Sequence, residues 1–271
     1  MLSSPGINHG AGGSGRALTI AGDLVIQGGK YEISGSGATA ANNLTVNGNV
    51  TLNAGSFNLS SSTVVGGFGN LNAKGNIALN DGTFGLASGS SNGNLILNGT
   101  AAQNVSLGAT TVATVQNLTV SNNAGVSFSG TNTFNVQGDV SFGNVNNATI
   151  SAAGKLKLIS NENFTGRVAD ITNNGVNSGN TISGDVIVER YIPLGKRAFR
   201  FLTPGVSTTN FILNNWQLGT HITGSTTVAN GFDITSTGNP SMYTYNNQAT
   251  SGTGWTAIAN TDVSAIILLV H

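Results

Sequence analysis

The chain has 271 residues, of which 7% are charged, and its 10 basic and 10 acidic residues give a net charge of zero. Because an ordinary soluble domain carries about 25% charged residues and nucleic-acid binding requires a basic face, this balance excludes nucleic acid as a partner. The chain has no cysteine, which excludes disulfides and cysteine-ligated metals. It has no apolar stretch of about 18 residues, which excludes a transmembrane helix.

Residues 1–16 are rich in glycine and serine, and we expect them to form a flexible N-terminal segment. The segment lacks the charged region and the apolar region of a secretory signal peptide. We therefore expect that the signal peptide is missing from this sequence or that the chain is a fragment.

Residues 17–160 contain a repeat of 26–27 residues. Its first copies open at Leu18, Leu44 and Leu71 and read LTIAGDLVIQGGKYEI, LTVNGNVTLNAGSFNL and LNAKGNIALNDGTFGL. Apolar and polar residues alternate as in strands, and Gly, Asn and Asp interrupt them as in turns. Weaker copies open at Leu95, Leu118 and Phe134. The repeat predicts a parallel β-helix or β-solenoid, in which equivalent residues of successive rungs (windings of three short strands) stack about 4.8 Å apart.

Glycine and asparagine recur at fixed offsets in these copies. We expect two glycine rows to hold positive φ at the corners of the rungs, and one asparagine row to be joined side chain to side chain. The glycine rows are Gly22, Gly48, Gly75 and Gly29, Gly55, Gly82, and the asparagine row is Asn43, Asn70, Asn94, Asn117. Stacked like charges would repel one another, which explains why this region has few charged residues.

Charge returns near Lys155, and residues 155–200 hold seven of the ten basic residues. The repeat is not visible beyond this point, and the segments 182–193 and 197–206 are predicted as strands. We expect residues 161–271 to form a small all-β, β-sandwich-like end module that caps the solenoid, because a bare solenoid end exposes unpaired backbone groups. A β-sandwich throughout is the competing fold, but it does not require a repeat at fixed offsets.

Four segments carry a resemblance to a known class of proteins. They are NLTVNGNVTLNAG, LNGTAAQNVSLGATTVATVQNLTVSNNAGVSFSG, GDVIVERYIPLGKRAFRFLTPGVSTT and GTHITGSTTVANGFDITSTGNPSMYTYNNQATSGTGWTAIANTD. Together they resemble the secreted surface proteins of the Bacteroidota with β-solenoid repeats, and filamentous haemagglutinin-like adhesins share the repeat pattern. The resemblance implies an adhesin-like cargo of the type IX secretion system. Such proteins usually continue into a C-terminal sorting domain, which is lacking here, so we expect a truncated or processed end at residues 264–271.

Two groups of residues in the second region are candidates for ligand binding. The cluster Lys196, Arg197 and Arg200 could bind an anionic glycan or a lipid head group, or it could be edge charge that blocks aggregation and pairs with Glu189 or Asp185. Aromatic side chains could stack on sugar rings, or they could fill the core of the module. These aromatic residues are Trp216, Tyr243, Tyr245 and Trp255.

The positions of the acidic residues indicate whether the chain could be an enzyme. Parallel β-helices can be polysaccharide lyases or glycosidases, whose chemistry needs converging acids or a basic residue beside the substrate. Residues 17–150 offer the acids Asp23, Glu32, Asp81 and Asp139. Their offsets place them in different rows, except that Asp23 and Asp139 share a row several rungs apart. We therefore expect no enzyme and no cofactor.

The predicted function is that of a non-catalytic extracellular structural protein or adhesin of the bacterial cell surface. Its partners would be surface glycans or further copies of itself, joined by β-strand addition at exposed ends and at the apolar tail Ala265–Val270. The alternative is a carbohydrate-binding module or a polysaccharide-degrading β-helix protein.

Overall fold

The computed structural model describes residues 7–8, 15–87, 92–172, 175–194, 199–206, 208–227, 229–250, 252 and 254–263. The chain divides into two compact units, Met1–Leu194 and Gly195–His271. Strands dominate the first unit, and the helices of the described residues are three 3-10 turns of three residues each, all in the second unit. None of these described helices has the length and apolar character needed to cross a membrane. The predicted fold class, an all-β chain that begins with a β-solenoid, is confirmed.

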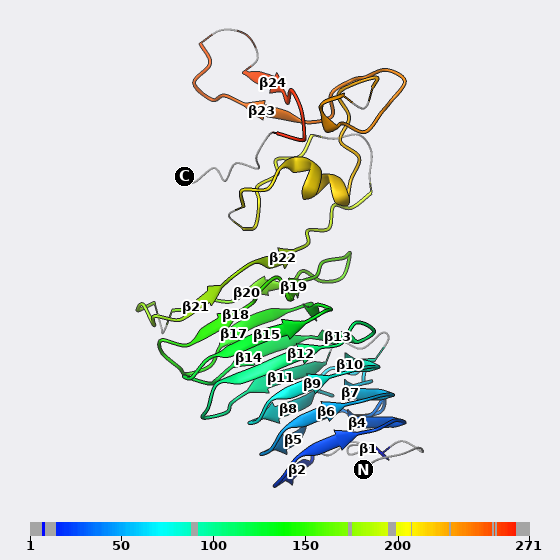
Figure 1. Cartoon of the computed structure of the whole chain (residues 1–271), viewed down its shortest axis with the longest axis vertical. Coiled ribbons are helices and arrows are strands. Elements are labelled where there is room, and N and C mark those ends of the chain that lie inside the picture. The colour runs from blue at the N-terminus through cyan, green and yellow to red at the C-terminus, as the bar shows by residue number, and fades with distance from the viewer. Residues whose placement is uncertain are drawn as a thin grey trace. The chain divides into compact units, whose positions relative to one another are not determined.

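The first unit consists of three parallel sheets, in which each strand pairs with the equivalent strands of the neighbouring rungs (Figure 1). The first sheet contains β2 (Ala17–Ile20), β5 (Asn42–Val46), β8 (Gly69–Ala73), β11 (Gly93–Leu97), β14 (Asn117–Val120), β17 (Asp139–Phe142) and β20 (Arg167–Val168). The second contains β3 (Leu24–Ile26), β6 (Val50–Leu52), β9 (Ile77–Leu79), β12 (Gln103–Leu107), β15 (Val126–Gly130), β18 (Thr149–Ser151) and β21 (Thr181–Ser183).

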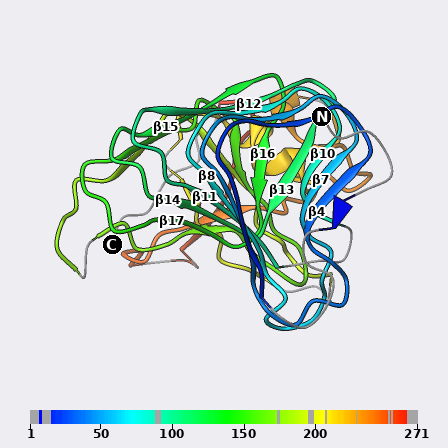
Figure 2. The same cartoon turned by 90° about the horizontal axis from the view of Figure 1, so that it is seen from below.

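The third sheet contains β1 (Ile7–Asn8), β4 (Lys30–Ser34), β7 (Ser56–Ser60), β10 (Thr83–Leu86), β13 (Val112–Val115), β16 (Phe134–Val136), β19 (Leu156–Leu158) and β22 (Val186–Val188). Figure 2 shows the successive windings of the unit lying one behind another. Each rung therefore uses one strand from each sheet, and the sheets form the walls of the solenoid.

The core is a set of columns in which apolar side chains of successive rungs stack inside these walls. Leu18, Leu44 and Leu71 are direct register partners, and the same column continues through Leu95 and Leu118. Leu44 is fully buried, whereas Leu18, in the first rung, is 42% exposed. Each interior position thus depends on the rung above and the rung below for its burial.

An aromatic column runs through the third sheet. The ring of Phe57 packs edge-to-face on Tyr31 (centroids 5.4 Å apart) and on Phe84 (5.5 Å). Phe134 belongs to this column, two rungs beyond Phe84, with Ala113 between them. Because alanine leaves room, the rings of Phe84 and Phe134 approach to 6.2 Å.

The expectation that Phe134 opens a repeat copy is therefore wrong. The residue that continues the column of opening leucines is Val140, which pairs with Leu118. The turns of this rung differ in length from those of the earlier rungs. The segment FNVQGDVSF imitates an opening because Gly138 follows Phe134 at the same offset at which Gly22 follows Leu18.

The two rows require glycine for different structural reasons. Gly29, Gly55 and Gly82 have φ of 73°, 83° and 94°, as expected for corner glycines. The row Gly22, Gly48 and Gly75 is not in the left-handed region, so the expectation of positive φ is wrong there. Close stacking explains this row, because a Cβ on Gly75 would overlap the carbonyl of Gly48 beneath it.

The solenoid extends past the expected boundary at residue 160. Strands β20, β21 and β22 pair in parallel with β17, β18 and β19 and so complete a further rung. The segment 182–193, predicted as one strand, instead supplies parts of β21 and β22, with a turn at Gly184 (φ 76°) between them. Longer loops before β20 and β21 hide this rung from a search at fixed period.

The second unit has a small core formed by Ile212, Ile222 and Phe232. Its elements are the 3-10 turns η1 (Ile212–Asn214), η2 (Trp216–Leu218) and η3 (Ala229–Gly231) and the strands β23 (Tyr243–Tyr245) and β24 (Trp255–Ala257). The two strands form one antiparallel sheet, which is smaller than the two packed sheets of a sandwich. Residues 199–206, the described part of the segment 197–206 predicted as a strand, form no strand, and their phenylalanines lie exposed beside Trp255.

Candidate functional surfaces

The outer face of the first sheet carries an asparagine ladder, a column of carboxamides bonded from rung to rung. Each Nδ2 donates to the Oδ1 of the preceding rung, from Asn70 to Asn43 (3.0 Å), from Asn94 to Asn70 (2.8 Å) and from Asn117 to Asn94 (3.0 Å). The backbone N–H of Asp139 donates to Asn117 Oδ1 (2.8 Å). The four asparagines are thus joined side chain to side chain in the manner expected from the sequence.

A second polar column lies at the start of the second sheet. Here the side-chain Oδ1 accepts a hydrogen bond from the backbone N–H of the next rung, from Asn49 to Asp23 (2.6 Å), from Asn76 to Asn49 (2.9 Å) and from Asn104 to Asn76 (2.8 Å). Asp23 therefore begins this column, whereas Asp139 follows the asparagine ladder of the first sheet. The expectation that Asp23 and Asp139 share a row is wrong, because it rested on the misassigned opening at Phe134.

A third column, which sequence reasoning missed, follows the second sheet. Asn53 Nδ2 donates to Gln27 Oε1 (2.9 Å), and Asn80 Nδ2 donates to Asn53 Oδ1 (2.7 Å). The signal was present, since an amide follows the second strand in each of the first three copies. The outer surface of the solenoid is therefore held together by uncharged side chains that bond along the stacking direction.

The acids of the solenoid occupy separate positions and take structural roles. Glu32 pairs with Lys30 on the third sheet (2.8 Å), and Asp139 pairs with Arg167 on the first (2.8 Å). Hydrogen bonds from the Thr110 hydroxyl (2.6 Å) and the Gly82 N–H (2.7 Å) hold the pKa of Asp81 below its ordinary value. In the described part of the chain, no group of three His, Asp or Glu side chains is arranged to hold a metal ion.

The Arg167–Asp139 pair lines a polar groove of about 470 Å³. Two glutamines beside it are bonded to each other, with Gln137 Nε2 donating to Gln116 Oε1 (2.8 Å). The half-buried Phe164 adds an apolar side chain to the lining. The groove offers amides and one ion pair to a polar ligand, although each of these groups already has a partner within the protein.

The second unit presents an exposed aromatic cluster, defined here as Phe199, Phe201, Tyr245 and Trp255. The ring of Trp255 lies 4.6 Å from that of Tyr245, 6.0 Å from that of Phe201 and 6.5 Å from that of Phe199. Exposed fractions are 83% for Phe199, 86% for Phe201, 53% for Tyr245 and 43% for Trp255. The structure therefore brings two of the predicted aromatic candidates together and adds two phenylalanines to them.

The other predicted candidates are placed differently. Tyr243 precedes Tyr245 by two residues on β23 and is also exposed. Trp216 packs against the small core of the unit, as in the alternative that such aromatics fill a core. Arg200 lies between the two phenylalanines in sequence, and Lys196 and Arg197 lie outside the described residues. Of the two acids proposed as partners of the basic cluster, Glu189 and Asp185, Glu189 pairs with Lys157 (2.6 Å).

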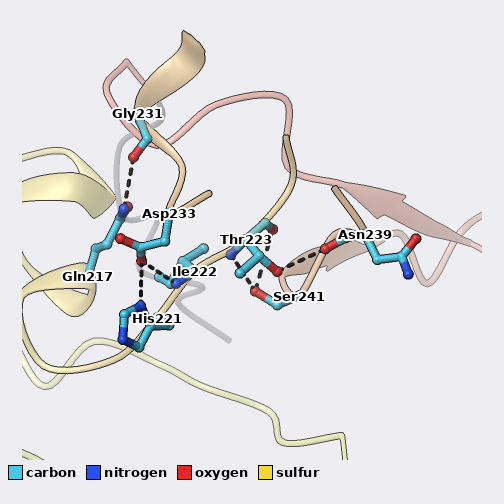
Figure 3. A network of polar contacts seen from close by, with 8 residues as sticks. All are labelled: Gln217, His221, Ile222, Thr223, Gly231, Asp233, Asn239 and Ser241. Atoms are coloured by element: carbon cyan, nitrogen blue, oxygen red, sulfur yellow. Dashed lines mark hydrogen bonds and ion pairs between the residues drawn. The ribbon is translucent and has the colours of Figure 1, made fainter. Parts of the chain in front are cut away.

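Polar contacts join the loops between the small core and β23 (Figure 3). Asp233 Oδ2 accepts from the backbone N–H of Ile222 (2.8 Å) and lies 3.6 Å from His221 Nδ1. The Ser241 hydroxyl accepts from the backbone N–H of Thr223 (2.9 Å), and Thr223 Oγ1 donates to the Asn239 carbonyl (2.8 Å). The aspartate and the serine here are committed to backbone groups, so the network fixes the loop that leads into β23.

Comparison of the chain with protein-family models, with curated proteins and with solved structures finds no match. Two surfaces then remain as the principal functional features. One is the outer surface of the solenoid with its columns of bonded amides, and the other is the aromatic cluster of the second unit.

Proposed function

We propose that the chain is a non-catalytic extracellular protein of the bacterial cell surface, which serves as a structural element or an adhesin. The observation that carries this proposal is the set of polar columns, in which uncharged side chains bond each rung to the next. The resemblance to surface proteins of the Bacteroidota supports the further proposal that the chain is a cargo of the type IX secretion system.

Continuous bonding along the stacking direction suits a protein that works outside the cell. Backbone pairs and side-chain ladders act on the same rungs, so local opening must break both kinds of hydrogen bond. Proteases cleave segments that open locally, and such a solenoid would resist them. The scarcity of charge on its surface also allows copies to lie close together without electrostatic repulsion.

Self-assembly by strand addition is part of the proposal. Within the described residues, the three sheets end at β1, β2 and β3 on one side, and edge strands of this kind can template pairing with another chain. Leu18 of β2 is 42% exposed, although its register partner Leu44 is fully buried. A further rung stacked on β2 would bury this leucine as the inner ones are buried. The apolar tail Ala265–Val270 lies outside the described residues.

The surface role can be tested on cells that produce the chain naturally. Antibodies raised against the purified protein should label intact cells, and beads coated with the protein should adhere to surfaces that the cells colonise. Uncoated beads are the control for adhesion. Labelling that appears only after the cells are broken would refute the proposed location.

Self-assembly can be tested by sedimentation of the purified chain across a concentration series. We expect Leu18→Lys to reduce association, because it places a charge at the stacking edge. Val65→Lys is the matched control, since Val65 is 95% exposed and lies between β7 and β8, away from the terminal rung. Equal association of the two variants would contradict strand addition at this end.

A further inference from the structure

The aromatic cluster of the second unit is unusual because large aromatic side chains are exposed side by side. Phe199 and Phe201 keep more than four-fifths of their surface in solvent, and Trp255 keeps 43%. Aromatic side chains of this size normally bury most of their surface, and contiguous exposed apolar patches usually mark interaction sites. We therefore expect the cluster to bind a ligand that covers it.

The hairpin β23–β24 fixes the geometry of the cluster. Tyr245 and Trp255 are register partners in the antiparallel pair, and the backbone N–H of Asn246 donates to the Gly254 carbonyl (2.9 Å) at the end of the pair. The planes of Phe199 and Phe201 lie within 30° of the plane of Trp255, at 25° and 29°. Because Tyr and Trp have few side-chain rotors, a surface held in this way loses little conformational entropy on binding.

The charge around the cluster limits the kind of ligand. Residues 241–257, which include both strands of the hairpin, contain no charged residue. The exposed polar groups of the hairpin are amides and hydroxyls, including those of Asn246, Asn247, Gln248 and Thr256. The exposed Arg200, between Phe199 and Phe201, is charged, but it already has an interaction partner within the protein. Because the hairpin is uncharged and Arg200 is already engaged, the surface favours an uncharged polymer, with which it can exchange hydrogen bonds, over an acidic polymer, which needs basic partners.

We propose that the aromatic cluster binds the sugar rings of a neutral polysaccharide. A pyranose ring has an apolar face of C–H groups that can lie flat on an aromatic ring, and hydroxyls at its rim that can bond to amides. The rings of Phe199, Phe201 and Tyr245 all lie within 6.5 Å of the Trp255 ring, measured between centroids. A chain of sugars could thus contact several rings at once. This inference specifies the class of ligand that the proposed adhesin would bind, and its biological meaning rests on that proposed function.

The test uses the full chain and its two tryptophans. In a Trp216→Phe background, Trp255 is the only indole, so its fluorescence reports on the cluster alone. Laminarin, galactomannan and hydroxyethyl cellulose are the neutral probes, and alginate is the acidic one. We expect a saturable change in emission with at least one neutral probe and none with alginate. Unchanged emission with every neutral probe would overturn the inference, and so would a change in emission with alginate alone.

Variants locate the binding surface in affinity electrophoresis through gels that contain the neutral probe. Trp255→Ala and Phe201→Ala should each weaken affinity about tenfold, as expected for aromatic anchors. Leu218→Ala is the matched control, since Leu218 is a 79% exposed apolar residue of the same unit, and it should bind normally. Phe201→Ala is the safer substitution for folding, because Phe201 is 86% exposed and lies outside the strands. Normal binding by both cluster variants would refute the assignment.

Two further results separate the competing explanations. A dimer of the purified chain that is lost in Trp255→Ala would show that a second copy occupies the cluster, which overturns the polysaccharide inference. Beads that adhere to the colonised surface equally well with wild type and with Trp255→Ala would overturn this inference while the adhesin proposal stands. Binding of laminarin by a chain that is absent from the cell surface would refute the proposed location and leave the sugar site intact.

Discussion

The corner glycine Gly55 provides a sharp test of how the rungs stack. Its φ of 83° is in the region that disfavours side chains, at a cost of about 1–2 kcal/mol for an L-residue. A Cβ added there would overlap the carbonyl oxygen of Gly29 in the preceding rung and lie 2.8 Å from its nitrogen. That same oxygen accepts the backbone hydrogen bond of Ser56 (2.9 Å), so it cannot move aside without loosening the rung contact.

The expected effect of Gly55→Ala follows from these two contributions. Weakening one backbone hydrogen bond adds about 0.5–1.5 kcal/mol to the conformational cost, so we expect a destabilisation of about 1.5–3.5 kcal/mol. Gly28→Ala is the matched control, because Gly28 has no positive φ and nothing lies within 4 Å of the added Cβ. Because alanine lowers the conformational entropy of the unfolded chain, Gly28→Ala should leave the free energy of unfolding unchanged or raise it by about 0.4–1 kcal/mol.

Equilibrium unfolding in urea, followed by far-UV circular dichroism, measures the difference between the two variants. Far-UV dichroism is the appropriate signal, because both tryptophans belong to the second unit and their fluorescence would not follow the solenoid. We expect the transition of Gly55→Ala to move to lower urea and that of Gly28→Ala to stay close to wild type. Coincident transitions for the two variants would refute the stacking of Gly55 on Gly29.

Three further predictions concern the core, the ladder and one carboxyl group. Phe57→Ala should destabilise the solenoid by about 3–5 kcal/mol, because its ring is fully buried between two others; a loss below about 1 kcal/mol in urea unfolding would contradict this packing. Asn70→Ala should cost about 1–2 kcal/mol through two lost ladder bonds, and Asn72→Ala, on the same face of the same strand, is its control in the same assay. Thr110→Val should raise the pKa of Asp81 in an NMR titration, since the Thr110 hydroxyl is the main cause of its depression. A depressed carboxyl pKa stabilises the fold above the pKa of the unfolded chain and loses that effect as pH falls through the folded pKa; an unchanged Asp81 titration would rule out the hydrogen bond.

The regular part of the fold could be predicted because each rung repeats the same local pattern. Alternation marks the inward residues, and equal offsets identify Leu44 and Leu71 as stacking partners. The method fails where a local pattern is imitated, since the segment FNVQGDVSF has the glycine spacing of an opening but places Phe134 in the aromatic column. The rung formed by β20–β22 escapes detection because longer loops precede β20 and β21.

The candidate sites were less accessible to sequence reasoning than the solenoid. The order Phe199-Arg200-Phe201 indicates that two rings share a side in an extended segment, but it does not indicate that this side meets Trp255. Likewise, the sequence could not separate Trp216, which packs on the core of its unit, from the exposed Trp255. Contacts between segments distant in sequence decide both cases, and no local pattern encodes them.

The distribution of charge along the columns has a chemical reason. A carboxamide has both a donor and an acceptor, so asparagine can bond to an identical residue above and below it, whereas a carboxylate can only accept. Asp23 stands at the start of its column, where the side chain only accepts. Asp139 stands at the far end of the asparagine ladder, where its carboxylate meets Arg167 of the next rung. Because amides inside the columns are already bonded to one another, they have little capacity left for a ligand, and recognition is better placed on the aromatic cluster, whose side chains are largely exposed.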